Sequence, residues 1–344
     1  MPSTRVLFVP VSGGAGSGEV QRCRLLAQAL QERWPQAEPQ FLLVPGVNAE
    51  PFETTTLSAS PTRVPDEVRA AIAALRPALV VFDGNARVAT LAAARDAGAR
   101  TLLVSSRPSA RDRGFRVRRM ARLDAHWLVG AELRGAPGWR ERLARWRHPR
   151  VDVRRFATLF APPAPAAPVL ARFGLPEGAA FAVVCAGGGG HADASTLFAD
   201  AATRLARGGV TTVAVGAPAS MPAIAVPALA NAELMGLLAA SRAALLAGGS
   251  LLVQALALDV PVVAVPLQAE QAARVRWLAQ AGAVQAEDKH DAPRLAQQVH
   301  ALIDDIDASN RLRAGVAKLG LHNGLDDAVE ALGTLAGLAP RSPL

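Results

Sequence analysis

The sequence predicts an α/β protein with two doubly wound, Rossmann-like domains, each built on a parallel sheet. Three observations support this fold class. Short apolar runs alternate with helical patterns along the chain, which is typical of parallel sheets covered by helices. The 344 residues exceed what one hydrophobic core normally spans. A stretch rich in proline and alanine, residues 161–168, divides the alternation into two series.

The first series occupies residues 1–160, the expected first domain. Apolar runs predict buried strands, and each is followed by a loop and a helix whose apolar residues recur at helical spacing. The predicted strands are residues 5–11, 41–44, 78–82 and 101–104. One predicted helix follows residue 18, and two further helices cover residues 66–75 and 88–97.

The same alternation restarts after the proline-rich stretch. Residues 161–168 are expected to form a semi-rigid connector, because proline removes backbone donors from helices and ladders. Residues 169–320 form the expected second domain, and residues 321–344 a C-terminal helix and tail. The predicted strands are residues 181–185, 211–215, 243–246 and 262–265, and the predicted helices are 194–205, 231–240, 251–258 and 271–281. Ligands of such open sheets bind at the carboxyl ends of the strands.

The composition indicates a folded globule. Hydrophobic residues make up 51% of the chain and charged residues 19%. The longest uncharged stretch, residues 243–258, is too short to span a bilayer, and no signal-peptide pattern is present, so a cytoplasmic location is expected. Cys23 and Cys185 are the only cysteines and support neither a disulfide framework nor a zinc site. We expect no metal and no cofactor.

The basic residues are concentrated in the first half of the chain. The net charge is +8; residues 1–155 carry +11 and the remainder −3. Seven arginines and one aspartate lie between Arg107 and Arg122, interleaved with Phe115, Val117 and Met120. Three interpretations stay open: contact with an anionic inner membrane face through shallow insertion of these apolar side chains, a solvated basic face, and recognition of an acceptor phosphate. Nucleic acid is not an expected partner, because no array of stacking aromatic residues accompanies the arginines.

A glycine-rich loop in the second domain has the features of a diphosphate cradle. Gly248, Gly249 and Ser250 follow a predicted strand and precede a predicted helix. Glycines allow backbone N–H groups to approach a phosphate, and a helix N-terminus favours negative charge. Gln254 lies one turn further along the same helix, and residues 268–271 offer polar groups for a sugar. Together these residues predict a nucleotide-sugar site.

The sequence around this loop resembles the donor half of GT-B glycosyltransferases. The matching residues are Gly248, Gly249, Ser250, Gln254, Ala257, Leu258, Val260, Pro261, Val262, Pro266, Glu270, Gln271, Ala281, Gly282 and Ala283. The likeness is nearest to family 28, which contains the lipid-linked peptidoglycan GlcNAc transferase and the UDP-sugar hydrolase of pseudaminic acid synthesis. It implies the GT-B fold, in which two Rossmann-like domains face across a cleft, and a donor site that needs no metal. Residues 1–160 would then be the acceptor domain and residues 169–320 the nucleotide-sugar donor domain.

The resemblance also implies a set of donor-binding residues. Gln254 stands where the family usually has Glu, which accepts hydrogen bonds from both ribose hydroxyls, whereas Gln both donates and accepts. Residues 226–229 match the stretch that contacts the base. The glycine turn of residues 187–191 is expected to contact phosphate, with His191 alternatively a solvated helix cap. The expected donor-binding residues are Gly188, Leu229, Gly248, Gly249, Ser250, Gln254, Gln268, Glu270 and Gln271.

The first loop of the chain also resembles its counterpart in this group. Gly16, Ser17 and Gly18 form the expected acceptor-side loop. Glu19 stands where family members usually have a His that activates an acceptor or water. Glu19 is therefore one candidate catalytic base, and Asp83, at the end of a predicted strand, is the other. Both have an alternative role as a helix cap or a loop hydrogen-bonding residue.

The resemblance implies an enzyme of the hexosyltransferase type. The expected reaction moves a sugar, with inversion, from a nucleotide diphosphate, UDP above all, to an acceptor such as a lipid-linked or cell-envelope glycan. Two alternatives stay open: a nucleotide-sugar hydrolase, and a nucleotide-sugar-binding subunit with little activity alone. The substitutions Glu19 and Gln254 at family positions motivate the last of these.

Overall fold

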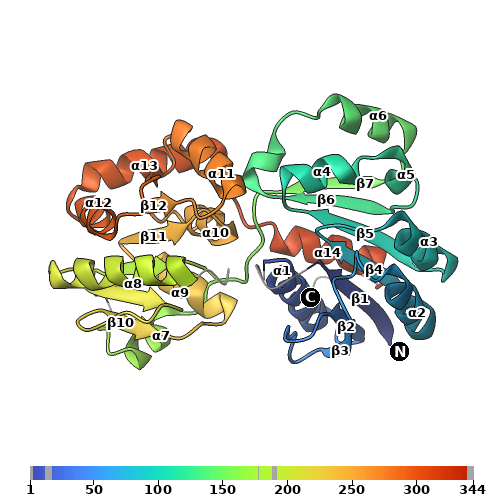
Figure 1. Ribbon diagram of the computed structural model, residues 1–344, viewed down its shortest axis with the longest axis horizontal. Helices are drawn as coiled ribbons and strands as arrows, with labels where there is room; N and C mark the ends of the chain where they lie inside the picture. The colour runs from blue at the N-terminus through green and yellow to red at the C-terminus, as the bar shows by residue number, and fades with distance from the viewer. Residues whose placement is uncertain (1–2, 12–17, 177, 188–191, 339–344) are drawn as a thin grey trace, which may run out of the picture. The chain divides into compact units, whose positions relative to one another are not determined.

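The computed structural model describes residues 3–11, 18–176, 178–187 and 192–338, and it contains two compact units (Figure 1). The first unit comprises Met1–Leu159 together with Gly324–Leu344, and the second comprises Phe160–Asn323. The chain therefore passes between the units twice. Each unit is an α/β structure with its own parallel sheet, as the sequence predicts.

The first unit contains a seven-stranded sheet with the order β3-β2-β1-β4-β5-β6-β7, and all its strand pairs are parallel. The strands are β1 (Thr4–Pro10), β2 (Ala37–Leu43), β3 (Glu53–Thr56), β4 (Leu79–Asp83), β5 (Arg100–Ser105), β6 (Ala125–Val129) and β7 (Asp152–Phe156). The chain runs outward from β1 to β3 and then returns to β4 on the other side of β1. The neighbours β1 and β4 therefore form the topological switch point of this sheet.

Helices cover both faces of the first sheet. They are α1 (Gly18–Arg33), α2 (Pro65–Leu75), α3 (Val88–Asp96), α4 (Pro108–Gly114), α5 (Val117–Met120), the 3-10 helix η1 (Ala131–Arg134), α6 (Trp139–Arg147) and α14 (Leu325–Leu335). One apolar cluster joins the sheet to α1 and α14. The other joins it to α2 and α3 and to single residues of α5 and α6. Alternate residues of the central strands supply the two clusters, as expected for a sheet buried on both faces.

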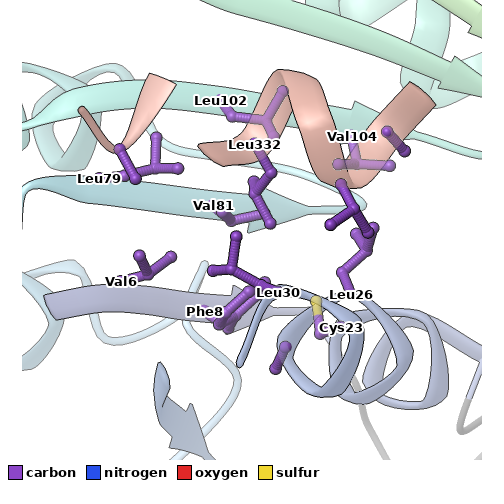
Figure 2. Packing of buried hydrophobic residues seen from close by; sticks show 14 of the residues in the cluster. Val6, Phe8, Cys23, Leu26, Leu30, Leu79, Val81, Leu102, Val104 and Leu332 are labelled. Carbon is purple, nitrogen blue, oxygen red and sulfur yellow. The ribbon is translucent and has the colours of Figure 1, made fainter. Parts of the chain in front are cut away.

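The C-terminal helix predicted within residues 321–344 completes the core of the first unit. Figure 2 shows Leu332 of α14 among Val81, Leu102 and Leu26. A Cβ atom placed on Gly333 would lie 2.3 Å from Cη2 of Trp34, so only glycine lets α14 approach α1 this closely. The last turns of the chain are therefore structural for the N-terminal unit.

The second unit contains a six-stranded parallel sheet with the order β10-β9-β8-β11-β12-β13. Its strands are β8 (Ala182–Cys185), β9 (Thr212–Val215), β10 (Ile224–Val226), β11 (Ala243–Ala247), β12 (Val262–Val265) and β13 (Gln285–Ala286). Its helices are α7 (Ala166–Arg172), α8 (Ala192–Arg207), α9 (Asn231–Ala240), α10 (Ser250–Ala257), α11 (Ala269–Gln280), α12 (Ala292–Asp304) and α13 (Ile306–Leu319). The switch point here lies between β8 and β11.

The proline-rich stretch differs from the connector that the sequence predicts. Helix α7 begins at Ala166, and Pro168 lies in its first turn, where a missing backbone N–H leaves no intrahelical bond unmade. The backbone N–H of Ala164 donates to the carbonyl of Ala232 at 2.9 Å. The segment is therefore anchored on α9, and the passage between units precedes it, at Leu159.

The arginine-rich segment from Arg107 to Arg122 forms α4, α5 and the turns beside them. Phe115 and Met120 are buried in the core of the first unit, and only Val117 of the three interleaved apolar residues is exposed. The expectation that Phe115 and Met120 insert into a membrane is therefore wrong. Within the part of the chain that the structure describes, no helix is long and apolar enough to cross a bilayer.

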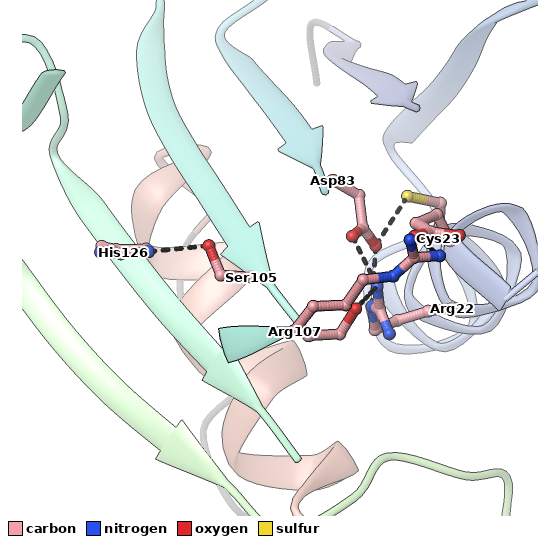
Figure 3. Close-up of polar contacts among 8 residues, drawn as sticks. Arg22, Cys23, Asp83, Ser105, Arg107 and His126 are labelled. Carbon is pink, nitrogen blue, oxygen red and sulfur yellow. Dashed lines mark hydrogen bonds and ion pairs between the residues drawn. The ribbon is translucent and has the colours of Figure 1, made fainter. Parts of the chain in front are cut away.

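A buried histidine lies under α4. His126 of β6 is fully buried, its Nε2 lies 3.0 Å from Oγ of Ser105, and its ring packs on Phe115 (Figure 3). A Cβ atom on Gly114 would lie 2.3 Å from the imidazole. Burial, and then the charges of nearby arginines, lower the pKa of His126 to about 3.

We expect His126 to make the fold sensitive to acid. Its folded-state pKa lies below the unfolded value, so the unfolded chain takes up the proton first as the pH falls. The resulting stability is present above about pH 6.5 and is lost progressively toward pH 3, by up to about 1.4 kcal/mol per pH unit. In urea unfolding across this pH range, the free energy of unfolding should fall less steeply with decreasing pH for His126→Gln than for the wild type. His322→Gln, an exposed control, should keep the wild-type slope; equal slopes in all three proteins would contradict the assignment.

Candidate functional site

Two loops of the first unit leave the sheet side by side at its switch point. Pro10, the last residue of β1, pairs in register with Asp83, the last residue of β4. The N–H of Val11 donates to the carbonyl of Asp83 at 2.9 Å. Of the expected acceptor-side loop, Gly16 and Ser17 lie outside the described residues. Gly18 is the exposed first residue of α1, which starts directly above this edge.

Asp83 forms a buried ion pair with α1 (Figure 3). Its carboxylate accepts hydrogen bonds from Nε of Arg22 at 2.7 Å and Nη2 of Arg22 at 2.5 Å, and Arg22 also donates to Oγ of Ser106 at 3.2 Å. Burial raises the pKa of Asp83 to about 6, with the Arg22 guanidinium opposing the rise. Burial also raises the pKa of the adjacent Cys23 thiol, which keeps it protonated.

This geometry favours a positioning role for Asp83 over the predicted role as a base. The carboxylate is fully buried, and the bidentate Arg22 occupies both of its oxygens. An acceptor hydroxyl would have to displace that partner to reach it. Asp83 instead fixes Arg22 and the first turns of α1 over the end of β4.

Glu19 lies in the first turn of α1, one turn before the Arg22 pair. It is largely buried, and its Oε1 lies 3.3 Å from Nη2 of the half-exposed Arg107, which follows β5. Gly84 has a φ of +91°, and a Cβ atom placed on it would lie 3.5 Å from Cγ of Glu19. The glycine therefore leaves space beside the Glu19 side chain. Glu19 is thus a carboxylate near a helix N-terminus at the carboxyl edge of the sheet, and its partner comes from a neighbouring loop.

The predicted donor loops of the second unit also meet at a switch point. Cys185, the last residue of β8, pairs in register with Leu246 of β11, so the turns that follow these strands start side by side. Gly187, with φ +80°, turns the chain after β8. Gly188 lies outside the described residues. Gly248 and Gly249 join β11 to α10, and Ser250 begins that helix.

The two glycines of this loop have different surroundings. A Cβ atom on Gly248 would lie 2.8 Å from Cγ2 of Val275 and 2.9 Å from Cβ of Gln271, both on α11. A Cβ atom on Gly249 would meet no atom within 4 Å. Gly248 is therefore required by packing, whereas Gly249 and the exposed Ser250 present an open helix N-terminus. An open N-terminus with free approach to its N–H groups suits a phosphate.

We expect Gly248→Ala to destabilise the second unit. The added methyl group must displace α11 or strain the loop, because its nearest neighbours are the Cβ of Gln271 and a valine methyl in a packed core. Overpacking of this kind costs about 1–3 kcal/mol. The measurement is the free energy of unfolding in urea, with Gly249→Ala as the matched control. Equal stability of the two variants would show that the tight contact does not restrain the loop.

The polar residues beyond the loop stand in two groups. Gln271 accepts a hydrogen bond from the N–H of Leu267 at 2.8 Å, and Arg274, which the sequence analysis missed, donates to the carbonyl of Gly248 at 3.0 Å. Gln271 therefore ties the loop after β12 to α11, and Arg274 ties the loop after β11 to the same helix. Gln268 and Glu270 are exposed at the start of α11.

Gln254 lies on α10, and Leu229 lies just before α9, the helix that packs against α10. Gln254 is half-buried on α10, one turn beyond Ser250. Leu229 precedes α9 and packs on the same apolar cluster as Leu251 of α10. The structure therefore brings Gly248, Gly249, Ser250 and Gln271 together directly, with Gln254 close along the helix. Leu229 joins them only through the shared cluster.

A group of arginines in the first unit has no acidic partner among the described residues. Arg119 of α5 is only 9% exposed, and among the described residues its side chain has no hydrogen bond or ion pair. Burial, and then the charges of Arg116, Arg113 and Arg87, lower its pKa. The Nε of Arg113 is also buried without a partner among the described residues. This excess of positive charge lies between α5 and the loop that follows β4, and it favours an anionic ligand.

No protein-family model matches the sequence, and a search of curated proteins gave no match. Solved structures with the same architecture do match it. The spinosyn forosaminyltransferase SpnP is 15% identical, with a TM-score of 0.68 over 97% of this chain and 100% of its own. MurG from Acinetobacter baumannii is 14% identical, with a TM-score of 0.59 over 96% and 99%. A putative UDP-N-acetylglucosamine 2-epimerase from Listeria monocytogenes is 12% identical, with a TM-score of 0.57 over all of both chains.

The matched proteins include two transferases and a protein named as an epimerase, so the likeness concerns the fold and leaves the reaction open. It extends over almost the whole chain and includes both parallel sheets. The chain therefore has the GT-B fold of these glycosyltransferases, as the sequence motifs predict.

Proposed function

We propose that this protein transfers a sugar from a nucleotide-diphosphate sugar, with UDP as the nucleotide, to an acceptor held by its first unit. The single observation that carries the proposal is the position of the strand ends that the two predicted loops follow. Strands β1 and β11 each end at the switch point of a Rossmann-type sheet, where open α/β sheets bind their ligands. The loop after β11 ends at the open N-terminus of α10.

The second unit supplies the donor site in this proposal. The N–H groups of Gly249 and Ser250 and the dipole of α10 would bind the diphosphate and stabilise the charge that develops on it as the sugar departs. Gln254 would bind the ribose, and main-chain groups near Leu229 would bind the base. The exposed Gln268 and Glu270 would contact the sugar.

The first unit supplies the base and the acceptor site. The acceptor oxygen attacks the anomeric carbon, the bond from that carbon to the diphosphate breaks, and the configuration inverts. The acceptor proton passes to Glu19, which is slightly less buried than Asp83 and, among the described residues, forms an ion pair with Arg107. Arg119, which has no ionic partner among the described residues, and its arginine neighbours support an acceptor that carries phosphate, such as a lipid-linked or cell-envelope glycan.

The proposal is tested by following nucleotide release from UDP-, GDP-, dTDP- and CMP-sugars with the full chain. Each reaction is run alone and with a phosphorylated lipid-linked sugar acceptor, and the sugar products are separated. The proposal expects release from one donor that depends on the acceptor, together with a new glycoside.

The other outcomes separate the remaining functions. Release of nucleotide and free sugar without an acceptor would identify a hydrolase. Saturable nucleotide binding without turnover in any reaction would identify a binding subunit. Either result would overturn the transferase proposal and leave the donor site intact.

A further inference from the structure

A cavity of about 460 Å³ lies at the amino edge of the first sheet. It is formed by the C-terminal ends of α3, α5 and α6 and by the residues that lead into β5, β6 and β7. A volume of this size is within the usual range of small-molecule sites. The polar and charged residues that line it are Arg95, Arg100, Asp124, Arg147, His148 and Arg150.

The cavity carries an excess of positive charge. Among the described residues that line it, four are arginines and only Asp124 is acidic. Nη1 of Arg100 donates to Oδ1 of Asp124 at 2.8 Å, and the N–H of Thr101 donates to Oδ2 at 2.8 Å. The one carboxylate is therefore already paired with Arg100 and bound to the sheet edge, so it does not neutralise the other three arginines.

The other three arginines are Arg95, Arg147 and Arg150. All are exposed, and none forms an ion pair within the part of the chain that the structure describes. An arginine in the last turn of a helix stabilises the helix dipole, which accounts for Arg95 of α3 and Arg147 of α6. Arg150 lies in the turn between α6 and β7, outside any helix, so the dipole does not explain it.

Two further features of the cavity suit a bound molecule. Nε2 of the half-buried His148 is enclosed and has no hydrogen-bond partner among the described residues. With a proton on this nitrogen, the ring can donate to an anion. Met120 and Leu123 also line the cavity, and both belong to an apolar cluster of the first unit. The lining therefore combines several cationic donors with an apolar side.

A second cavity, of about 750 Å³ between α2 and α3, offers a comparison. Its charged lining residues are Asp66, Arg69, Arg76 and Asp96, and Arg69 pairs with Asp66 at 3.1 Å. Equal numbers of acidic and basic residues give no preference for an anion. The excess of positive charge at the amino edge is therefore not shared by this other groove of the same unit.

The cavity is separate from the candidate functional site. Asp83 ends β4 at the carboxyl edge of the sheet, and Glu19 lies beside that edge. Strand β6 has five residues, so its two ends lie roughly 15 Å apart. Because open α/β sheets bind their substrates at the carboxyl edge, a molecule in this cavity would be neither the sugar donor nor the acceptor.

We propose that the cavity lined by Arg95, Arg100, Arg147, His148 and Arg150 binds a small phosphorylated molecule. Guanidinium groups bind phosphate through charge-assisted hydrogen bonds, often two from one side chain. The ligand carries more than one negative charge, because three of the arginines have no other ionic partner among the described residues. The inference does not depend on the function proposed above.

The test is a calorimetric titration of the full chain with inorganic pyrophosphate, at constant ionic strength. The proposed donor loop would also bind a diphosphate, so Gly249→Asp is used as the parent protein. We expect saturable binding to this parent, weakened at least about 10-fold when Arg95→Gln and Arg150→Gln are added. Both arginines are exposed, so the variant should fold, and its circular dichroism and melting temperature serve as checks. The titration contains no lipid, so binding identifies a free phosphorylated molecule as the ligand.

Arg140→Gln combined with Arg142→Gln in the same parent is the matched control. It removes two exposed charges of the first unit that do not line the cavity, and it should keep the affinity of the parent. Equal weakening by the two pairs would overturn the proposal, because the general charge of the unit would then explain the binding. Absence of saturable binding to the parent would also overturn it, as would unchanged affinity in the Arg95 and Arg150 variant.

The proposal and the function proposed above can fail separately. Pyrophosphate binding that persists in Gly249→Asp and is lost with Arg95 and Arg150 supports this site even if no sugar donor releases its nucleotide. Binding to the wild type that disappears in Gly249→Asp alone would assign all the pyrophosphate to the donor loop and overturn the proposal made here.

Discussion

Gly249→Asp is expected to abolish nucleotide binding while leaving the protein folded. The new carboxylate would stand where the diphosphate is proposed to bind, at the N-terminus of α10. A negative charge about 4 Å from a phosphate repels it by about 4 kcal/mol at an effective dielectric constant of about 20, and solvent screening reduces this. We therefore expect the affinity for the nucleotide to fall at least about 100-fold, measured by calorimetric titration.

The surroundings of Gly249 make this variant interpretable. No atom lies within 4 Å of a Cβ at this position, and its φ of −79° is accessible to any residue. Gly249→Ala is the matched control: it adds bulk without charge and should change the affinity far less. An unchanged affinity in Gly249→Asp would place the nucleotide elsewhere. Equal losses in the Ala and Asp variants would show that the loss does not come from charge.

Glu19→Gln is expected to lower turnover roughly 100- to 10,000-fold, the usual contribution of a general base. The amide keeps the size of the side chain but cannot accept the proton. Because Glu19 belongs to the first unit and the nucleotide is proposed to bind the second, the affinity for the nucleotide should stay unchanged. Steady-state turnover of the sugar donor and calorimetric titration of the nucleotide measure the two effects separately.

Arg107→Gln distinguishes the base from a structural ion pair. It removes the cation that lies 3.3 Å from Glu19 and leaves the carboxylate in place. If Glu19 acts as the base, this variant should keep much more turnover than Glu19→Gln. Equal losses in both variants would instead assign Glu19 to holding the loop after β5.

Periodicity and apolar runs were sufficient to predict most of the central strands. The strands predicted at residues 78–82 and 262–265 correspond to β4 and β12, which are buried on both faces and therefore read as continuous apolar runs. The edge strand β3 was missed because its sequence, ETTT, is exposed throughout and has no apolar pattern. The strand β7 was missed because charged residues fill most of DVRRF. Arg154 pairs with Asp152 within the strand, and Arg155 pairs with Glu141 of α6.

Only those features of the candidate site that depend on residues close together in the sequence could be predicted. Glycines between a strand and a helix locate a turn, and the strand order then places that turn at a switch point. The role of Asp83 depends on Arg22, which is 61 residues away in the sequence. Likewise, Phe115 and Met120 were interpreted as surface residues because their neighbours are arginines, whereas the layer of helices over β4 and β5 buries them. Contacts between distant residues leave no periodic signal in a single sequence.

Hydrogen–deuterium exchange of the full chain, with and without the nucleotide, shows whether a nucleotide binds at the loop between β11 and α10. We expect the nucleotide to slow exchange in peptides covering residues 247–254, and Gly249→Asp to lose this protection. Nucleotide-dependent protection confined to the first unit, or protection of residues 247–254 that persists in Gly249→Asp, would show that the nucleotide does not bind at this loop.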